Sequence, residues 1–182
     1  MLSHSSDQTS SPCVLGIDPG KNGALAFIDP ERSTLCIYAM PKFSITRTKT
    51  KDYVDLHEIR RLIGLKNPTH AYIEEVSASP QMGVTSAFNF GANAFGVKGV
   101  LVGRDIPISY VRPQTWKAKL RAPRDKQESK ARAKELFPLC ANSITTPDKA
   151  EAAMIAFYGC LDLGLMPRGA LRDASPVLLV GS

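Results

Sequence analysis

Four carboxylates at three points of the sequence constrain its fold more than any other feature. They are Asp18 at the end of the apolar segment CVLGID, Glu74 after AYI, and Asp148 with Glu151 at the start of a helical pattern. Acidic side chains are rarely buried unless a cation pairs with them. If the fold brings these carboxylates to one point, their oxygens form a pocket of the kind that Mg²⁺ or Mn²⁺ prefers.

The overall charge indicates the class of ligand. The 182 residues include 23 Lys and Arg against 17 Asp and Glu, a net charge of +6. If several of the acids bind metal, the remaining surface is more basic than this number suggests. An acidic pocket in a basic surface fits a polyanion held at its backbone and cut with the help of metal ions. On charge alone, a mildly cationic solvated surface is an equally good interpretation.

The length and the tails define the expected domain. About 100–200 residues form one domain, so we predict a single domain over residues 12–165. We expect a disordered polar tail over residues 1–11 and a tail without assignable structure over residues 166–182. Residues 1–11 lack the pattern of a secretory signal, and no apolar run is long enough to span a membrane. We therefore expect a cytoplasmic protein of a bacterium or phage without a membrane partner, and an organelle is the less favoured alternative.

The hydrophobic patterns predict alternating strands and helices. Strand patterns cover residues 13–18, 23–29, 34–40, 70–76 and 106–111, and helical patterns cover residues 52–66, 86–103, 126–136 and 148–163. A further short helix precedes Pro123. Residues 42–51 carry four Lys or Arg, no acid and no usable period, so we expect a mobile basic loop. Three consecutive antiparallel strands followed by alternating helices and strands predict an α/β fold with a mixed five-stranded sheet flanked by helices.

The positions of the acids on these elements are similar to those of the ribonuclease H fold. The chain resembles the RuvC family of Holliday junction resolvases in GIDPG around Asp18, YIEEV around Glu74, and DKAEAAMIA with Asp148 and Glu151. The last motif and the run PQMGVTSAFNFG resemble the phage and chloroplast branch. Together the motifs span about residues 13–160. Glu151 is a departure, because the bacterial family commonly has Asp there.

This resemblance implies a Mg²⁺-dependent endonuclease that nicks opposite strands of four-way DNA junctions. Two metal ions, for which Mn²⁺ can substitute, would be held by Asp18, Glu74, Asp148 and Glu151, with Asp18 as the bridging ligand. Neighbouring side chains of a strand face opposite ways, so only one of Glu74 and Glu75 can enter the site, and the resemblance selects Glu74. Two symmetrical nicks also imply a homodimer. Its interface is expected on the glycine-spaced helix, where Phe88, Phe95 and Val102 recur every seven residues, although the same residues could pack against the sheet.

The resemblance also suggests which residues bind DNA. Lys126 and Lys117 align with basic residues of the family, and we favour Lys126 for a direct catalytic role. Lys117 could instead hold the DNA backbone, and either lysine could be solvated surface. Phe88 and Phe90 follow Glu74 where the family has an aromatic that stacks on an unpaired base, and we favour core packing for at least one of the two. Trp116 is expected to be packed. Arg47 and Lys49 of the basic loop are further candidates for DNA contacts.

Other functions remain open at this point. A nuclease of the same fold could act on flaps, replication forks or RNA–DNA hybrids instead of junctions. A non-catalytic DNA-binding module is also possible, but it would not need four acids. The turn DPGKNGA resembles the phosphate loop of actin-like ATPases, yet such enzymes need two domains of this kind and 182 residues are too few. No small-molecule substrate is expected. The four cysteines, which lack metal-site spacing, are expected to be reduced and buried.

Overall fold

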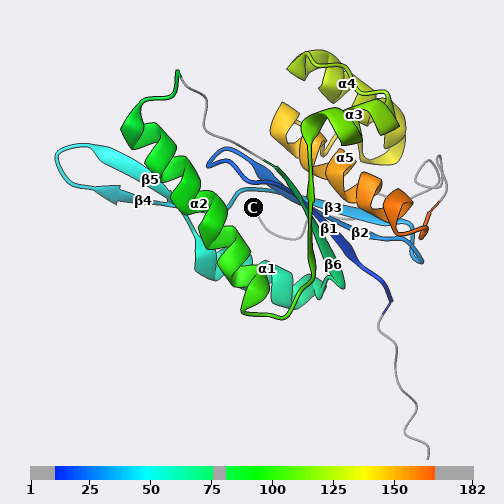
Figure 1. The fold of residues 1–182 in the computed structure, drawn as a ribbon, viewed down its shortest axis with the longest axis horizontal. Helices are drawn as coiled ribbons and strands as arrows, with labels where there is room; N and C mark the ends of the chain where they lie inside the picture. The colour runs from blue at the N-terminus through cyan, green and yellow to red at the C-terminus, as the bar shows by residue number, and fades with distance from the viewer. Residues whose placement is uncertain (1–10, 76–80, 167–182) are drawn as a thin grey trace, which may run out of the picture.

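The computed structural model describes residues 11–75 and 81–166, which fold around one mixed sheet (Figure 1). Its strand order is β3-β2-β1-β6-β7. The strands β1 (Val14–Asp18), β2 (Ala24–Asp29) and β3 (Thr34–Ala39) pair antiparallel, and β6 (His70–Glu74) and β7 (Ile108–Val111) continue the sheet parallel to β1. The predicted α/β fold with a mixed five-stranded sheet is confirmed.

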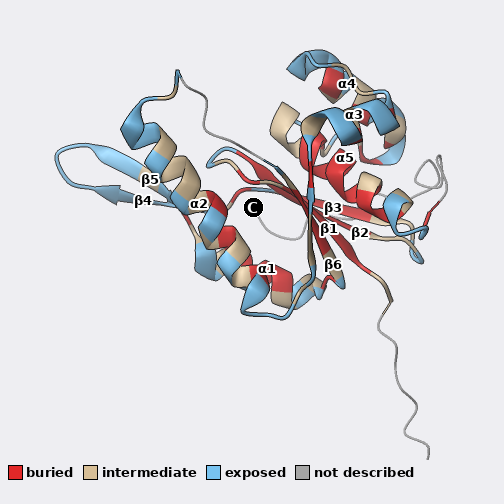
Figure 2. Ribbon diagram, in the orientation of Figure 1, coloured by how far each residue is buried: buried red, intermediate tan, exposed pale blue. Residues whose placement is uncertain are grey.

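Helices cover both faces of the sheet (Figure 1). One face carries α5 (Pro147–Asp162), with α3 (Pro113–Leu120) and α4 (Lys126–Leu136) beyond it, and the other carries α1 (Leu56–Lys66) and α2 (Val84–Val102). The alternation of side chains along β1 builds two cores, since Val14 packs on the α5 side while Leu15 and Ile17 pack on the α1 side. Figure 2 shows that burial is greatest in the sheet and in α5.

The contact between α5 and β1 is unusually close and fixes the position of the acids. A Cβ atom on Gly16, in the middle of β1, would overlap the backbone of Ala152 and Ala156. Only glycine lets the helix backbone lie directly on the strand here. Because Asp18 ends β1 and Asp148 lies in the first turn of α5, this contact holds two of the four acids next to each other.

The prediction of a mobile basic loop over residues 42–51 is wrong. These residues form most of a hairpin of β4 (Lys42–Thr46) and β5 (Thr50–Val54). Cross-strand pairs stabilise it: the rings of Phe43 and Tyr53 stack with centroids 5.7 Å apart, and Ser44 Oγ donates to Asp52 at 2.8 Å. Phe43 and Ile45 alternate with polar residues along β4, but this period covers only five residues, all of them exposed, and a polar, lysine-rich turn follows. The strand signal is therefore short and was missed.

Some predicted element boundaries also differ. The first helix begins at Leu56 instead of Asp52, because residues 52–54 belong to β5 and Asp55 caps the helix by accepting from the amides of His57 and Glu58. The predicted helix over residues 126–136 is confirmed at both ends. Residues 1–10 and 167–182, which include nearly all of the two predicted tails, lie outside the described residues. No helix within the described ranges is long and apolar enough to cross a membrane.

Candidate metal and nucleic-acid site

All four predicted acids line one open cleft at the end of the sheet. Asp18 and Glu74 end the parallel neighbours β1 and β6, so both carboxylates emerge at the same edge. Asp148 and Glu151 lie three residues apart on one face of α5. The cleft has a volume of about 490 Å³, and Lys117 and Lys126 also line it.

Three of the acids form a tight group, and the fourth is held separately. Oxygens of Asp18, Asp148 and Glu151 all lie within 4.8 Å of one another. Glu74 lies outside this group, and its Oε1 accepts a hydrogen bond of 3.0 Å from Nε1 of the buried Trp116. The packed position expected for Trp116 is therefore found, and its indole N–H orients a site carboxylate.

Glu74 enters the cleft while its neighbour Glu75 does not, as strand alternation predicts. Glu75 is exposed and pairs with Arg112 at 3.1 Å. It does not line the cleft that holds Glu74. The choice between the two glutamates, made above from the resemblance, agrees with this geometry.

The acidic group is costly without a cation. Burial, and then the charges of Glu74, Glu151 and Asp148, raise the pKa of Asp18 to about 7. Burial also raises the pKa of Glu74, although the hydrogen bond from Trp116 opposes this. A divalent cation would offset both the desolvation and the repulsion. The donors are all carboxylate oxygens, which are the ligands of hard cations, so the group fits a metal ion of that kind.

Two lysines balance the acids from the neighbouring helices. Lys117 of α3 is largely buried, and its Nζ lies 2.8 Å from Glu151 Oε1. Lys126 begins α4 after the capping residue Asp125, and its Nζ lies 3.4 Å from Asp148 Oδ1 with the side chain 64% exposed. Burial lowers the pKa of Lys126, but the carboxylates of Asp148, Glu151 and Asp18 outweigh it and raise that pKa overall. Both candidate lysines are thus in contact with the acidic group.

The predicted aromatic and basic residues lie in three different places. Phe90 lines the acidic cleft. Phe88 is 75% exposed on α2, so it is not part of the core of the described chain. Arg47 and Lys49 are exposed at the tip of the β4–β5 hairpin, where the Arg47 amide donates to the Lys49 carbonyl, and they do not line the cleft.

The turn between β1 and β2 supplies cleft residues that were not among the site residues predicted from the sequence. Lys21 and Asn22 both line the cleft beside Asp18. Lys42 of the hairpin donates to Asn22 Oδ1 at 3.3 Å, so the turn also contacts β4. A Cβ on Gly23 would overlap the carbonyl oxygen of Asp18, so glycine is required for this turn. Because Lys21 follows Asp18 by only three residues, the sequence could have indicated that Lys21 lies beside the acids.

No family model matches the sequence, and no curated protein matches it. A solved structure of Thermus thermophilus RuvC in complex with a Holliday junction substrate matches with a TM-score of 0.56, covering 84% of this chain and 97% of that chain at 15% identity. The chain has the fold of RuvC. A second Thermus thermophilus RuvC structure matches at a TM-score of 0.52, 16% identity, and 84% and 97% coverage.

A fowlpox virus Holliday junction resolvase also matches, with a TM-score of 0.47, 15% identity, and coverage of 83% of this chain and 99% of that chain. The RuvC matches confirm the ribonuclease H-like fold class inferred from the order of the acids. At about 15% identity they establish the fold, and the chemistry of this chain has to be argued from its own residues.

Proposed function

We propose that the protein is a metal-dependent endonuclease that resolves four-way DNA junctions by symmetrical paired nicks. The observation that carries this proposal is the convergence of four carboxylates and two lysines in one cleft of a RuvC fold. A purely DNA-binding module would gain nothing from partly buried acids that repel both the phosphates and one another. The acids are therefore explained best as metal ligands.

The ligand set divides between two ions, for which we propose Mg²⁺, with Mn²⁺ as a substitute. Asp18 interacts with each of the other three acids, so we assign it as the shared ligand. Glu74, which Trp116 orients, would be a ligand of one ion. Asp148 and Glu151 would be ligands of the other ion. When bound, the ions would supply activation of the attacking water and charge stabilisation of the leaving oxygen.

The two lysines have different roles in this proposal. Lys117 is largely buried against Glu151 and therefore holds that carboxylate in position. Lys126 is mostly exposed at the mouth of the cleft, so its ammonium can contact a phosphate of the bound strand. Positive charge placed there favours the transition state, in which negative charge builds up on the phosphate oxygens. We assign Lys126 the direct role and Lys117 a positioning role.

Paired nicks require two sites, and one face of α2 is suited to join two copies of the chain. Its exposed apolar residues follow a helical spacing: Val84, Phe88, Phe95 and Val102 are 88%, 75%, 72% and 65% exposed. Such a row on a charged protein marks an interaction surface. Between these residues, Cβ atoms on Gly91 and Gly99 would meet nothing within 4 Å in the monomer, so another helix could approach closely there. We propose that this row is the homodimer interface.

Lys98 supports the same assignment. Its Nζ lies 4.9 Å from the ring centre of Phe95 and 4.6 Å from that of Tyr110 on the edge strand β7. The cation holds the two exposed rings side by side, so the apolar row of α2 continues onto β7. A continuous apolar surface of this kind buries more area in a dimer than α2 alone.

The substrate is tested with a panel of DNAs. Purified protein is incubated with a synthetic four-way junction, a linear duplex, a flap and an RNA–DNA hybrid, each in Mg²⁺, Mn²⁺ or Ca²⁺. Symmetrical nicks confined to the junction, in Mg²⁺ and Mn²⁺, are the expected result. Preferential cutting of the flap or the hybrid would support the nuclease chemistry but show that the four-way junction is not the preferred substrate. If the wild-type protein and the Asp18→Asn variant behave alike on every DNA, the protein is not a metal-dependent nuclease of this kind.

A further inference from the structure

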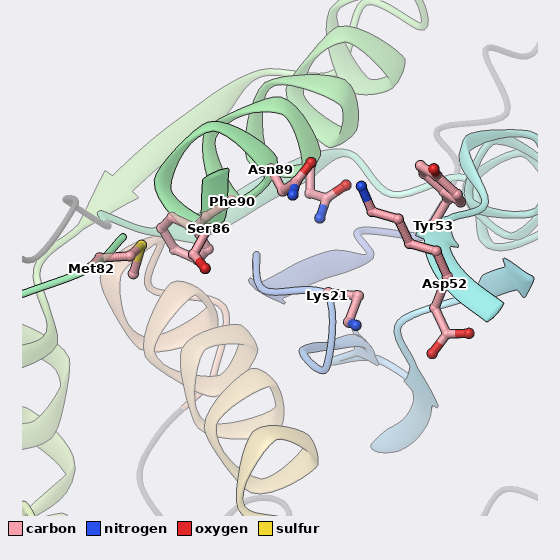
Figure 3. A pocket seen from close by; sticks show the side chains of 9 residues that line it. Lys21, Asp52, Tyr53, Met82, Ser86, Asn89 and Phe90 are labelled. Atoms are coloured by element: carbon pink, nitrogen blue, oxygen red, sulfur yellow. The ribbon is translucent and has the colours of Figure 1, made fainter. Parts of the chain in front are cut away.

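A second cavity opens beside the acidic cleft and is distinct from it. We call it the hairpin groove: it lies between β5 and the first half of α2, with Lys21 at its base, and has a volume of about 330 Å³ (Figure 3). This volume is within the range of about 300–1,000 Å³ typical of ligand pockets. Lys21 and Phe90 line both cavities, so the groove adjoins the cleft.

The helix wall of the groove carries polar side chains that lack partners. Ser86, Asn89 and Asn93 line it at a spacing of three and four residues, which places them on one face of α2. Figure 3 shows Asn89 on the side of the helix that faces Tyr53 of the hairpin. Among residues 11–75 and 81–166, neither asparagine has a side-chain hydrogen-bond partner. Each amide therefore presents both donors and an acceptor to the groove.

The other walls supply apolar faces and positive charge. Tyr53 and Phe90 offer aromatic rings, and Met82 adds a polarisable apolar surface. Lys51 and Lys21 line the same space, with Lys51 Nζ 5.3 Å from the ring centre of Tyr53. The acid in the lining, Asp52, accepts a hydrogen bond from Ser44 on the neighbouring strand. Amides, aromatic rings and lysines together match the three parts of a nucleotide: the base edge, the base face and the phosphate.

We propose that the hairpin groove binds one unpaired nucleotide next to the scissile phosphate, and that Asn89 and Asn93 read the edge of its base. This inference rests on the proposed nuclease function. A strand whose phosphate reaches the acids of the cleft passes Lys21 and Phe90, which lead directly into the groove. A base stacked in a duplex cannot enter such a cavity, so the occupant is a base that has left its stack. The groove would give the cleavage a preference for certain bases at one position.

The first test measures cleavage of junctions that differ only in the base pairs flanking the cut. We expect the wild-type protein to prefer one base at one of these positions, and an abasic site there to slow cleavage. The variants Asn89→Ala and Asn93→Ala should lose this preference and cut the best junction about ten- to hundredfold more slowly, as expected for the loss of a bidentate base contact. The control Asn142→Ala, in the exposed turn before α5, should behave as wild type. An unchanged base preference in both groove variants would overturn the inference.

The second test does not depend on cutting. The fluorescence of 2-aminopurine placed beside the cut position is measured on junction binding in Ca²⁺, where a base that leaves its stack becomes brighter. The wild-type protein should increase the signal, and Asn89→Ala and Asn93→Ala should reduce that increase while junction affinity stays within about threefold, because phosphate contacts supply most of it. No increase at either flanking position would overturn the inference even if junctions are cut. An increase with a protein that cuts no DNA would support the groove and contradict the nuclease proposal.

Discussion

The two long helices that flank the sheet have opposite relationships to the rest of the chain. Ten of the 16 residues of α5 are buried, and its backbone rests on β1 at Gly16. By contrast, α2 buries only Ala94, Val97 and Leu101 and leaves a row of large apolar side chains exposed. One helix is positioned completely by its own chain, as a metal site needs. The other has surfaces left for a second copy and for DNA.

The largest expected effect comes from separating α5 from β1. Gly16→Ala places a methyl group against the backbone of Ala152 and Ala156, which cannot move aside as a flexible side chain can. We expect about 3 kcal/mol of lost stability, at the upper end for overpacking, together with loss of cleavage. Urea unfolding followed by circular dichroism measures it.

The matched control is Gly91→Ala on α2, where a Cβ meets nothing within 4 Å. At a protein concentration low enough to keep the chain monomeric, alanine should stabilise this helix by about 1 kcal/mol. In the proposed dimer the same methyl group would oppose close helix packing, so the comparison is made on the monomer. Equal destabilisation by both substitutions would mean that the two helices do not differ in the way described.

The next effect is stabilisation by metal. Bound cations offset the repulsion among the partly buried acids, so Mg²⁺ at about one hundred times its Kd should stabilise the protein by about 2.7 kcal/mol. For a chain of this size that corresponds to a rise of about 5–10 °C in Tm. The Asp18→Asn variant should melt higher than wild type without metal, because it removes the most strongly perturbed carboxyl, and should respond less to Mg²⁺. A thermal melt that is insensitive to metal in both proteins would contradict the site.

A smaller effect is expected on assembly. Phe95→Glu places a charge in the centre of the exposed row of α2, so the dimer should weaken by at least about 2 kcal/mol, or roughly thirtyfold in Kd. The stability of the folded monomer should change little, because the side chain is exposed. Leu65→Glu, an equally exposed apolar residue on α1, is the control. Sedimentation velocity distinguishes the outcomes, and a wild-type protein that is monomeric at all concentrations would contradict the interface.

The smallest of these effects concerns the orientation of Glu74. Trp116→Phe keeps the buried ring but removes the N–H that holds Glu74. Partners that orient metal ligands are typically worth about 10–100-fold in affinity or activity, and we expect the low end because Glu74 lies outside the tight acidic group. The affinity for Mn²⁺ and the cleavage rate should fall together. If the variant binds Mn²⁺ normally but cleaves slowly, Trp116 does not orient a metal ligand and acts on the bound DNA instead.

The contrast between the helices also explains which features the sequence could predict. The acids were predictable because each one interrupts or ends a strongly apolar element. Strand alternation allowed only one of Glu74 and Glu75 into the site, and the family resemblance selected Glu74. The hairpin was not predictable, since the alternation along β4 is only five residues long and the pairs that hold its strands together, such as Phe43 with Tyr53, form only when the hairpin folds. The groove was missed for another reason. Lys51 and Asn89 become neighbours of one cavity only when the hairpin folds beside α2, and nothing local in either segment indicates this.

The most direct test of the central claim uses a supercoiled plasmid that extrudes a cruciform. Two nicks made symmetrically at one junction convert the plasmid to the linear form, whereas a single nick gives only the open circle. We predict linear product from the wild-type protein in Mg²⁺, uncut plasmid with Asp18→Asn, and no cutting of a plasmid without the cruciform. Equal cutting of both plasmids, or linear product from Asp18→Asn, would contradict a junction-resolving site built on these four carboxylates.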